Sequence, residues 1–191
     1  MRILIVDGHP DPDPARFIHA LADAYAQGCE AGCHSLRRLR LADMEFPLLR
    51  SPKEWAESEA CPVISAAQDD ISWAQHVVLL YPLWLGDVPA LVKAFLEQVA
   101  RPGFAFRNRK KGLPEKLLAG RSARIVMSMG MPTIYYRLFY FAHSLKSLER
   151  NIFRFIGFAP VRHTIIGAVD SGEEDRRKDL AAMRELGRRG R

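Results

Sequence analysis

Residues Pro82 to Gly86, with the sequence PLWLG, place a flat aromatic side chain beside a permissive backbone position. Such a loop suits a planar heteroaromatic ligand, because Trp84 offers a stacking surface and nearby main-chain N–H groups can bind the polar edge of a ring. The competing interpretation makes Trp84 a core residue, since tryptophan side chains are mostly buried. Taken alone, the loop slightly favours the core interpretation.

A second loop, GHPDPDPARF from Gly8 to Phe17, has the residues for a phosphate site. If a helix begins near Phe17, its first N–H groups are free to bind an anion, and His9 and Arg16 could add donors. The loop is neither a P-loop nor a G-x-G-x-x-G dinucleotide motif. A proline-rich turn that merely redirects the chain is an equally good interpretation.

A third loop, MSMGMPTIYYRLFYFAH from Met127 to His143, combines small residues with proton carriers. Ser128 and Gly130 allow a ligand to approach the backbone closely. A tyrosine and a histidine, such as Tyr135 and His143, could hold or deliver a proton as charge develops on a redox-active ring. The alternative for the aromatic residues is a packed or subunit-facing surface, which we expect for Phe139, Tyr140 and Phe141.

The elements that must position these loops alternate between strands and helices. Short apolar or β-branched runs predict strands at 2–6, 34–41, 76–80, 124–128 and 160–169. Apolar residues at helical spacing predict a helix from Phe17 and others over 63–73, 89–99, 145–155 and 173–188. This alternation predicts an α/β fold, a flavodoxin-like doubly wound sheet of five parallel strands in the order 2-1-3-4-5. That order brings the three loops to one edge, at the carboxyl ends of the first, third and fourth strands.

The composition indicates one globular domain over residues 1–191, since 48% of the residues are hydrophobic and 26% are charged. We expect no transmembrane segment, because no apolar run is long enough, and no secretory signal, because MRILIV meets Asp7 and Gly8 at once. These features predict a cytoplasmic protein.

The formal net charge of +6 is concentrated in Arg107 to Lys111 and in Arg184 to Arg191, rather than along one helix face. A nucleic-acid site would need a basic stripe with interleaved aromatics, so we expect none. Gly187 and Gly190 predict that the basic C-terminal tail frays. Cys29, Cys33 and His34 lack a second ligand pair, so we expect no metal site.

Taken together, the three loops resemble the NAD(P)H:quinone oxidoreductase family. The resemblance rests on HPxPxxxxF after the first strand, on YPLWLGDVPALVKAFLEQV with PGFAF after the third, and on a methionine-glycine loop followed by tyrosines and a histidine. That family includes DT-diaphorase, the modulator of drug activity B proteins, and ancillary flavoprotein subunits of potassium efflux systems. The resemblance implies a homodimer that binds FAD, or alternatively FMN, without a covalent bond.

The resemblance also assigns roles to individual residues. His9 and Phe17 would contact the phosphate or ribityl portion of the flavin. One side of the isoalloxazine would meet Pro82, Leu83, Trp84 and Leu85; the other would meet Ser128, Met129 and Gly130. Tyr135 and His143 would assist charge redistribution, although the spacing leaves Tyr136 open as the partner of His143. The chain departs from the family at Ala15 and Arg16, where a hydroxyl is usual and Arg16 could substitute a charge, and at Met129, which would narrow the pocket.

Two hypotheses of function follow. In the first, the protein is an enzyme in which NAD(P)H reduces the flavin and a quinone or similar electrophile then accepts two electrons. In the second, it is a regulatory subunit that docks on a potassium-efflux-type transport protein through its basic loop and tail. The complete flavin loop favours the enzyme. The sequence does not choose between FAD and FMN or between NADPH and NADH, and it does not name the acceptor.

Overall fold

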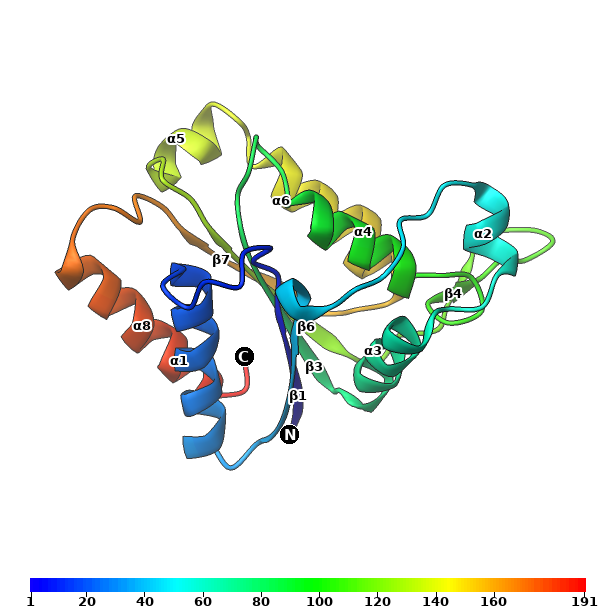
Figure 1. Ribbon diagram of the computed structural model, residues 1–191, viewed down its shortest axis with the longest axis horizontal. Coiled ribbons are helices and arrows are strands. Elements are labelled where there is room, and N and C mark those ends of the chain that lie inside the picture. Colours follow the sequence, from blue (N-terminus) through cyan, green and yellow to red (C-terminus); the bar gives the residue numbers. More distant parts are fainter.

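The computed structural model describes residues 1–191 and has a central sheet of five parallel strands (Figure 1). The strands are β1 (Arg2–Asp7), β2 (Ser35–Arg40), β3 (His76–Pro82), β6 (Ser122–Ser128) and β7 (Val161–Ile166). Their order, β2-β1-β3-β6-β7, is the predicted 2-1-3-4-5 when the strands of this sheet are numbered along the chain. The α/β class and the strand order are therefore confirmed.

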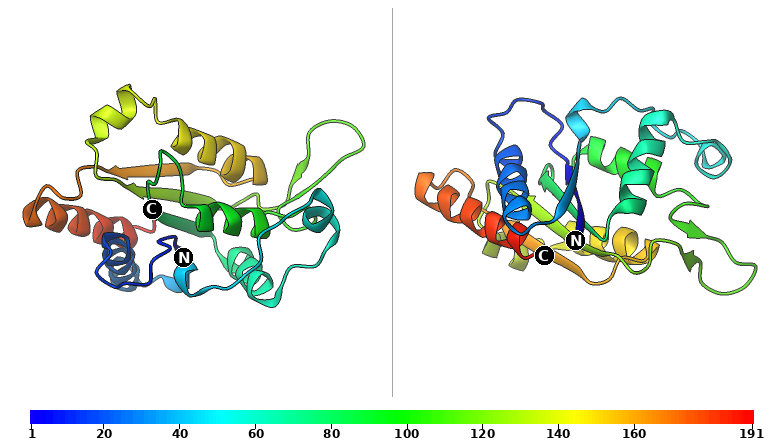
Figure 2. Two further views of the ribbon diagram at one scale, coloured as in Figure 1. Left: turned by 45° about the horizontal axis from the view of Figure 1, so that its top comes forward. Right: turned by 90° about the horizontal axis from the view of Figure 1, so that it is seen from below.

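Two layers of helices cover the sheet. The helices α1 (Phe17–Ala31) and α8 (Glu173–Arg188) lie against one face, whereas α3 (Pro62–Trp73) and α4 (Ala90–Val99) lie against the other, as Figure 2 shows. Along β1, Ile3 and Ile5 face the first layer, and Leu4 and Val6 face the second. Successive side chains of a strand point to opposite faces, so a strand between two helical layers must be apolar on both.

The central strand β3 is buried over its whole length and extends to Pro82, two residues beyond the predicted end. Its last residues pair with β6, where Tyr81 lies opposite Met127 and Pro82 opposite Ser128. The second strand is less buried than the others, as predicted. None of the helices is both long and apolar enough to cross a bilayer.

Several short elements complete the fold. The basic stretch after Phe106 belongs to a hairpin of β4 (Phe106–Arg107) and β5 (Glu115–Lys116), which projects from the body (Figure 2). The predicted helix at 145–155 is a helical run of three parts, α6 (His143–Ser147), η2 (Leu148–Phe153) and α7 (Arg154–Ile156). Further short helices are η1 (Leu41–Asp43), α2 (Pro52–Glu57) and α5 (Thr133–Leu138).

The prediction that the C-terminal tail frays is wrong, because α8 packs closely on α1. A Cβ atom at Gly28 would lie 1.9 Å from the carbonyl oxygen of Arg184, and one at Gly187 would lie 2.1 Å from that of Tyr25. The Tyr25 hydroxyl also donates a hydrogen bond to a backbone oxygen of Arg191. The two glycines let the backbones of the helices touch, and this contact fixes the end of the chain.

The contact predicts that Gly28→Ala destabilises the protein. Alanine normally stabilises a helix relative to glycine by about 1 kcal/mol, but here the added methyl group must push α8 away. We expect a net loss of about 3 kcal/mol in the free energy of unfolding, measured by urea denaturation. Ala181→Gly, at an exposed position of α8, is the control and should cost about 1 kcal/mol. A stabilised Gly28→Ala protein would contradict the close packing.

His76 predicts a loss of stability in acid. The residue begins β3, is almost fully buried, and its Nδ1 lies 2.8 Å from the Ser122 hydroxyl. Burial, helped by the charges of Arg124 and Arg162, lowers the pKa of His76 to about 4. The unfolded chain protonates this ring with a pKa of about 6.5, so acidification from that pH to about pH 4 favours the unfolded state.

We therefore expect the free energy of unfolding to fall by about 2 kcal/mol between pH 7 and pH 5 on account of His76. Urea denaturation at the two pH values measures it. The His76→Gln protein has no group that titrates at this position, so it should lose about 2 kcal/mol less than the wild type over this interval. Equal losses in both proteins would show that His76 is not the responsible group.

Candidate functional site

The loops that follow β1, β3 and β6 meet at one edge of the sheet, as predicted. The ring centroids of His9 and Trp84 are 5.8 Å apart and the rings meet edge to face. The Leu83 N–H donates to the Ser128 carbonyl over 2.7 Å, which ties the loop after β3 to the end of β6. The parallel sheet thus brings residues 9, 84 and 128 to one edge.

A tight turn presents Trp84 to solvent. Trp84 and Asp87 exchange two main-chain hydrogen bonds of 2.9 and 3.0 Å, and the two residues between them have positive φ, 48° at Leu85 and 82° at Gly86. Such a turn projects from the strand ends. Trp84 is 47% exposed and Leu85 is fully exposed, so the interpretation of Trp84 as a core residue is wrong.

Several main-chain N–H groups at this edge make no hydrogen bond within the protein. They belong to Leu85 and Gly86 in the β3 loop and to Gly130 and Met131 in the β6 loop. A Cβ atom at Gly130 would meet nothing closer than 3.9 Å, so there is open space beside that backbone. Flat aromatic surface with unbonded N–H donors on two loops suits the ring system of a flavin.

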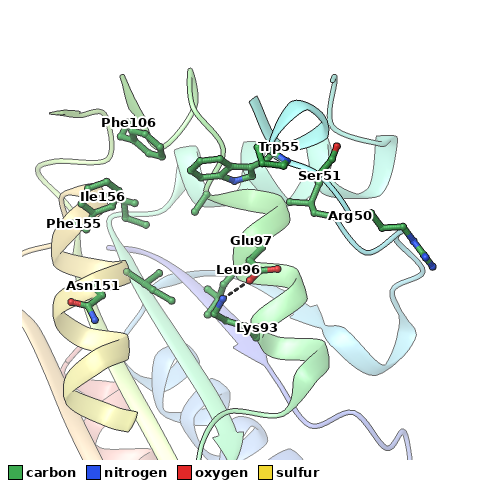
Figure 3. Close-up of a pocket in the computed structure, with 14 residues that line it drawn as sticks. Arg50, Ser51, Trp55, Lys93, Leu96, Glu97, Phe106, Asn151, Phe155 and Ile156 are labelled. Carbon is green, nitrogen blue, oxygen red and sulfur yellow. Dashed lines mark hydrogen bonds and ion pairs between the residues drawn. The ribbon is translucent and has the colours of Figure 1, made fainter. Parts of the chain in front are cut away.

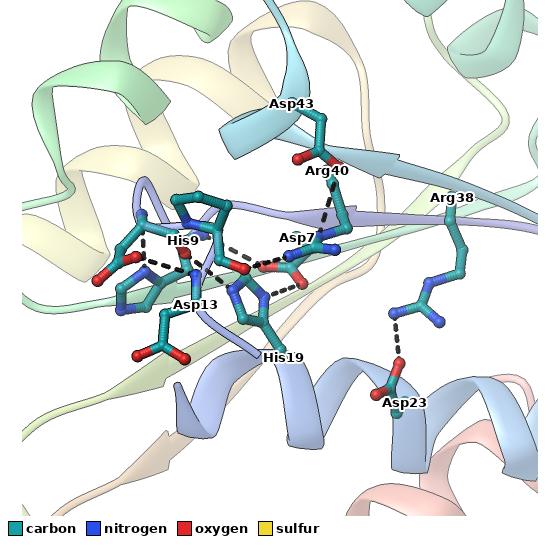
Figure 4. Close-up of polar contacts among 10 residues, drawn as sticks. Asp7, His9, Asp13, His19, Asp23, Arg38, Arg40 and Asp43 are labelled. Carbon is teal, nitrogen blue, oxygen red and sulfur yellow. Dashed lines mark hydrogen bonds and ion pairs between the residues drawn. The ribbon is translucent and has the colours of Figure 1, made fainter. Parts of the chain in front are cut away.

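A buried polar network lies directly beneath this surface (Figure 4). Asp7 is 1% exposed, and its carboxylate accepts hydrogen bonds from the His9 N–H (3.2 Å) and from His19 Nδ1 (2.6 Å). His19 Nε2 lies 2.9 Å from the Asp11 carbonyl oxygen. Both nitrogens of His19 face acceptors, an arrangement that a ring with a proton on each nitrogen satisfies.

The network determines the protonation state and the tautomer of the His9 ring. Burial, and then the adjacent charge of His19, lower the pKa of His9, which favours a neutral ring at pH 7. His9 Nδ1 accepts a hydrogen bond from the Asp11 N–H over 3.1 Å, so the proton of the neutral ring lies on Nε2. That N–H has no partner within the protein and is a donor beside Trp84.

The β1 loop is poorly suited to bind a phosphate. Prolines at positions 10, 12 and 14 have no N–H, and the intervening residues donate to the side chain two positions earlier, Asp13 to Asp11 (2.9 Å) and Ala15 to Asp13 (3.0 Å). Figure 4 shows the part of this ladder around His9 and Asp13, and from His9 to Arg16 each N–H is either missing or already bonded. The N–H groups that remain free belong to Phe17 and Ile18, in the first turn of α1.

Two residues predicted for the phosphate end are occupied elsewhere. The Arg16 guanidinium forms ion pairs with Asp11 at 2.7 Å and with Asp13 at 3.4 Å, so two carboxylates already neutralise its charge, and its role at the phosphate end stays a prediction. The ring of Phe17 lies under the guanidinium of Arg176 of α8, 4.6 Å from the ring centroid. The Phe17 side chain therefore takes part in the packing between α1 and α8.

The predicted ring contacts divide into exposed and buried residues. Trp84 and Leu85 are accessible, Leu83 is partly buried, and Pro82 and Ser128 are buried at their strand ends. Met129 is 4% exposed and its side chain belongs to the hydrophobic core. The expectation that Met129 narrows the pocket is therefore wrong, because only its backbone lies at this edge.

The structure does not join Tyr135 to His143. Tyr135 is half exposed and stacks on Phe139, with 5.0 Å between ring centroids, whereas His143 lines a separate hollow near Lys146. Tyr136 is excluded as the alternative, because it is buried and its hydroxyl bonds to Ser144 Oγ at 2.7 Å. The roles of Tyr135 and His143 as a proton-handling pair stay a prediction.

A large hollow lies away from this edge, on the side of α4 (Figure 3). It has a volume of about 630 Å³ and lies between α2, α4 and α7, with Trp55, Phe106 and Phe155 in its wall. An ion pair joins Lys93 and Glu97 on α4 at its side. None of the predicted flavin contacts lines this hollow.

Sequence reasoning missed Asp7 and His19, the buried pair of the network. Asp7 was noted only as the residue that follows the first apolar run, and His19 was not distinguished from the apolar residues around it in α1. A signal was present, since an Asp at the end of a buried strand needs a partner and His19 lies in the first turn of the next helix. The alternation of Asp and Pro likewise signals side-chain to backbone turns.

Comparison with known proteins supports the assignment of a flavodoxin-like fold to this chain. The family model Flavodoxin_2, described as flavodoxin-like fold, matches residues 1–188. An uncharacterized NAD(P)H oxidoreductase of Haemophilus influenzae is 27% identical over 191 residues, which cover 96% of this chain and 94% of that protein. An FMN-dependent NADH:quinone oxidoreductase of Alcanivorax borkumensis is 28% identical over 138 residues, 67% of this chain and 63% of that protein.

A solved structure, NAD(P)H:quinone oxidoreductase from Methanothermobacter marburgensis, superposes with a TM-score of 0.84 at 22% identity and covers 100% of this chain and 99% of its own. At that identity the superposition establishes the fold. The match of the family model over nearly the whole chain decides the membership. This chain belongs to the Flavodoxin_2 family of proteins with a flavodoxin-like fold.

Proposed function

We propose that the protein is a flavin-dependent NAD(P)H:quinone oxidoreductase. The observation that carries this proposal is the exposed Trp84 beside the neutral, buried His9, with unbonded N–H groups on the loops that follow β3 and β6. One relative reported above is named an FMN-dependent NADH:quinone oxidoreductase and another an NAD(P)H oxidoreductase, which supports the reaction class.

FMN is the cofactor we propose, in place of the FAD that the resemblance favoured. The relative from Alcanivorax borkumensis is named as FMN-dependent. The structure adds a physical reason, because the β1 loop offers few phosphate donors and contains Asp11 and Asp13. One phosphate placed at the N–H groups of Phe17 and Ile18 is easier to hold there than the two phosphates of FAD.

The residues at the edge would each have a simple task. Trp84 and Leu85 would bound the ring system on one side, and the backbone at Gly130 would lie on the other. The donors to its polar atoms would be His9 Nε2–H and the N–H groups of Leu85, Gly86, Gly130 and Met131. A bound flavin supplies hydride acceptance and donation, while these groups orient it and stabilise negative charge on the ring.

Purification followed by extraction and mass identification of the bound cofactor tests the proposal. We expect a yellow protein that contains FMN and oxidises NADH or NADPH when a soluble quinone is present. A colourless protein that binds neither FMN nor FAD, and that stays inactive with both nucleotides, would refute it. The same assay decides between NADH and NADPH, because the two donors are compared on one preparation.

Other expectations about assembly and partners remain predictions. Sedimentation velocity tests the homodimer implied by the resemblance. The alternative function, docking on a potassium-efflux-type transport protein, gains no support from the relatives reported above, which are named as oxidoreductases. The basic segments that motivated it are structural in part, because Arg184 bonds to Gln27 of α1 and Arg188 to Glu185. Cytoplasmic localisation is likewise untested.

A further inference from the structure

Arg124, near the start of β6, is a buried cation without an acidic partner. Its side chain makes one hydrogen bond, from Nη1 to the Thr164 hydroxyl over 2.7 Å, and the residue is 7% exposed. The Arg124 Nε–H is buried and has no acceptor. Arginine is almost never buried in this way unless it is paired. A guanidinium held in such surroundings attracts an anion strongly, because a protein interior screens charge less than water does.

The register of the sheet gathers further donors around Arg124. Arg162 pairs with it on the neighbouring strand β7. His76 of β3 pairs with Ser122, two residues before Arg124. Because alternate residues of a strand share one face, all these side chains lie on the face that α1 and α8 cover. His76 is 1% exposed, and its Nε2 has no hydrogen-bond partner.

The segment after α8 brings a third guanidinium to the same place. The Tyr25 hydroxyl of α1 donates to a main-chain oxygen of Arg191 over 3.1 Å. Burial lowers the pKa of Arg124, and the positive charges of Arg162 and Arg191 lower it further, so the three guanidinium groups are close enough to repel one another. The cluster therefore combines three cations with the ring of His76, which is neutral at pH 7.

No carboxylate within the protein offsets this charge. None forms an ion pair with Arg124, Arg162 or Arg191, and none lies near enough to shift the pKa of Arg124 or of His76. Glu185, the last acidic residue of the sequence, is bound by two arginines at its own end of α8. A terminal carboxylate at Arg191 would offset only one of the three charges. The balance of charge thus favours the binding of an anion from solution.

We propose that Arg124, Arg162, Arg191 and His76 form a binding site for a phosphate group. A phosphate carries up to two negative charges and several acceptor oxygens, which suit the fork-shaped donors of guanidinium groups. The Ser122 hydroxyl can donate to His76 Nδ1, which leaves Nε2–H as a further donor. All four residues lie at the amino ends of their strands or after α8, at the opposite end of the sheet from the three loops. The site is therefore separate from the proposed flavin edge.

Calorimetric titration of the full chain with inorganic phosphate and with glycerol 3-phosphate tests the site, with chloride used to keep the ionic strength constant. We expect saturable binding, and the tighter ligand shows whether the group is free phosphate or a phosphate ester. Phosphate at about one hundred times its dissociation constant should raise the melting temperature by about 6 °C. No saturable binding of either ligand would overturn the proposal and leave the oxidoreductase assignment intact.

Two variants remove one guanidinium each. Arg124→Met and Arg162→Gln should both weaken the binding of phosphate by at least about tenfold, since each removes charged hydrogen bonds to the ligand. Without phosphate, Arg124→Met should melt no lower than the wild type, because it removes a buried charge that has no partner. Arg162 is exposed, so Arg162→Gln keeps the test valid even where Arg124→Met fails to fold. Wild-type affinity in Arg162→Gln would overturn the proposal.

Arg177→Gln is the matched control, because Arg177 is an exposed arginine of α8. It should bind phosphate as tightly as the wild type does. The pKa of His76, followed by NMR of its ring, gives a second readout. Burial and the arginine charges hold this pKa at about 4, so bound phosphate should raise it. An equal loss of binding in Arg177→Gln and Arg162→Gln, or a pKa of His76 that phosphate leaves unchanged, would show nonspecific attraction and overturn the proposal.

Discussion

Asp7→Ala is expected to lower the free energy of unfolding by about 3–5 kcal/mol, the largest effect of any substitution considered. The carboxylate is buried and accepts hydrogen bonds from His19 and from the backbone of His9. Its removal leaves the buried His19 Nδ1 and the His9 N–H without an acceptor, and a buried group that loses its partner bears the full cost of desolvation. Urea denaturation at pH 7 measures the loss.

Two control variants test whether the buried network causes the loss of stability in Asp7→Ala. Asp23→Ala removes the carboxylate of an exposed pair with Arg38 and should cost less than about 1 kcal/mol. The double variant Asp7→Ala with His19→Ala removes both buried partners and should be more stable than the sum of the two single losses predicts. If Asp7→Ala costs no more than Asp23→Ala, the network does not hold the β1 loop in place.

Trp84→Ala is expected to weaken the binding of FMN by about tenfold to a hundredfold, the loss typical when an aromatic side chain that stacks on a flat heterocycle is removed. The exposure of Trp84 means that little packing is lost, so the melting temperature should hardly change. Titration of the apoprotein with FMN, followed by the quenching of flavin fluorescence, measures the affinity.

Trp73→Ala is the matched control. The Trp73 ring lies under the guanidinium of Arg37, 4.4 Å from its centroid, at the end of α3 and away from the three loops. Its loss should leave the affinity for FMN unchanged, and Trp84→Phe should restore most of the binding. An unchanged affinity in Trp84→Ala would remove the β3 loop from the cofactor site.

The sequence was sufficient for the sheet because burial on both faces leaves a strong pattern. The continuous apolar run from His76 and the helical spacing after Phe17 each follow from a single periodicity. The β4–β5 hairpin was missed because strands of two residues have no period to detect. The α5 helix was missed because its exposed aromatic residues do not mark one buried face.

The site was predicted less completely than the sheet, for a physical reason. The convergence of the three loops follows from strand order, which the sequence predicts. The exposure of Trp84 depends on the positive φ of Leu85, a non-glycine residue that no pattern marks for that conformation. The pairing of Asp7 with His19 depends on how α1 returns across the end of β1, which is a tertiary contact rather than a local preference.

The alternation of Asp and Pro in the β1 loop has a consequence for the energetics of recognition. A loop with fixed proline angles and bonded amides has little conformational freedom left to lose. The binding of a ligand beside this loop therefore costs little conformational entropy of the protein. The rate of ligand exchange would then be governed by the ligand's own contacts and not by the closing of this loop.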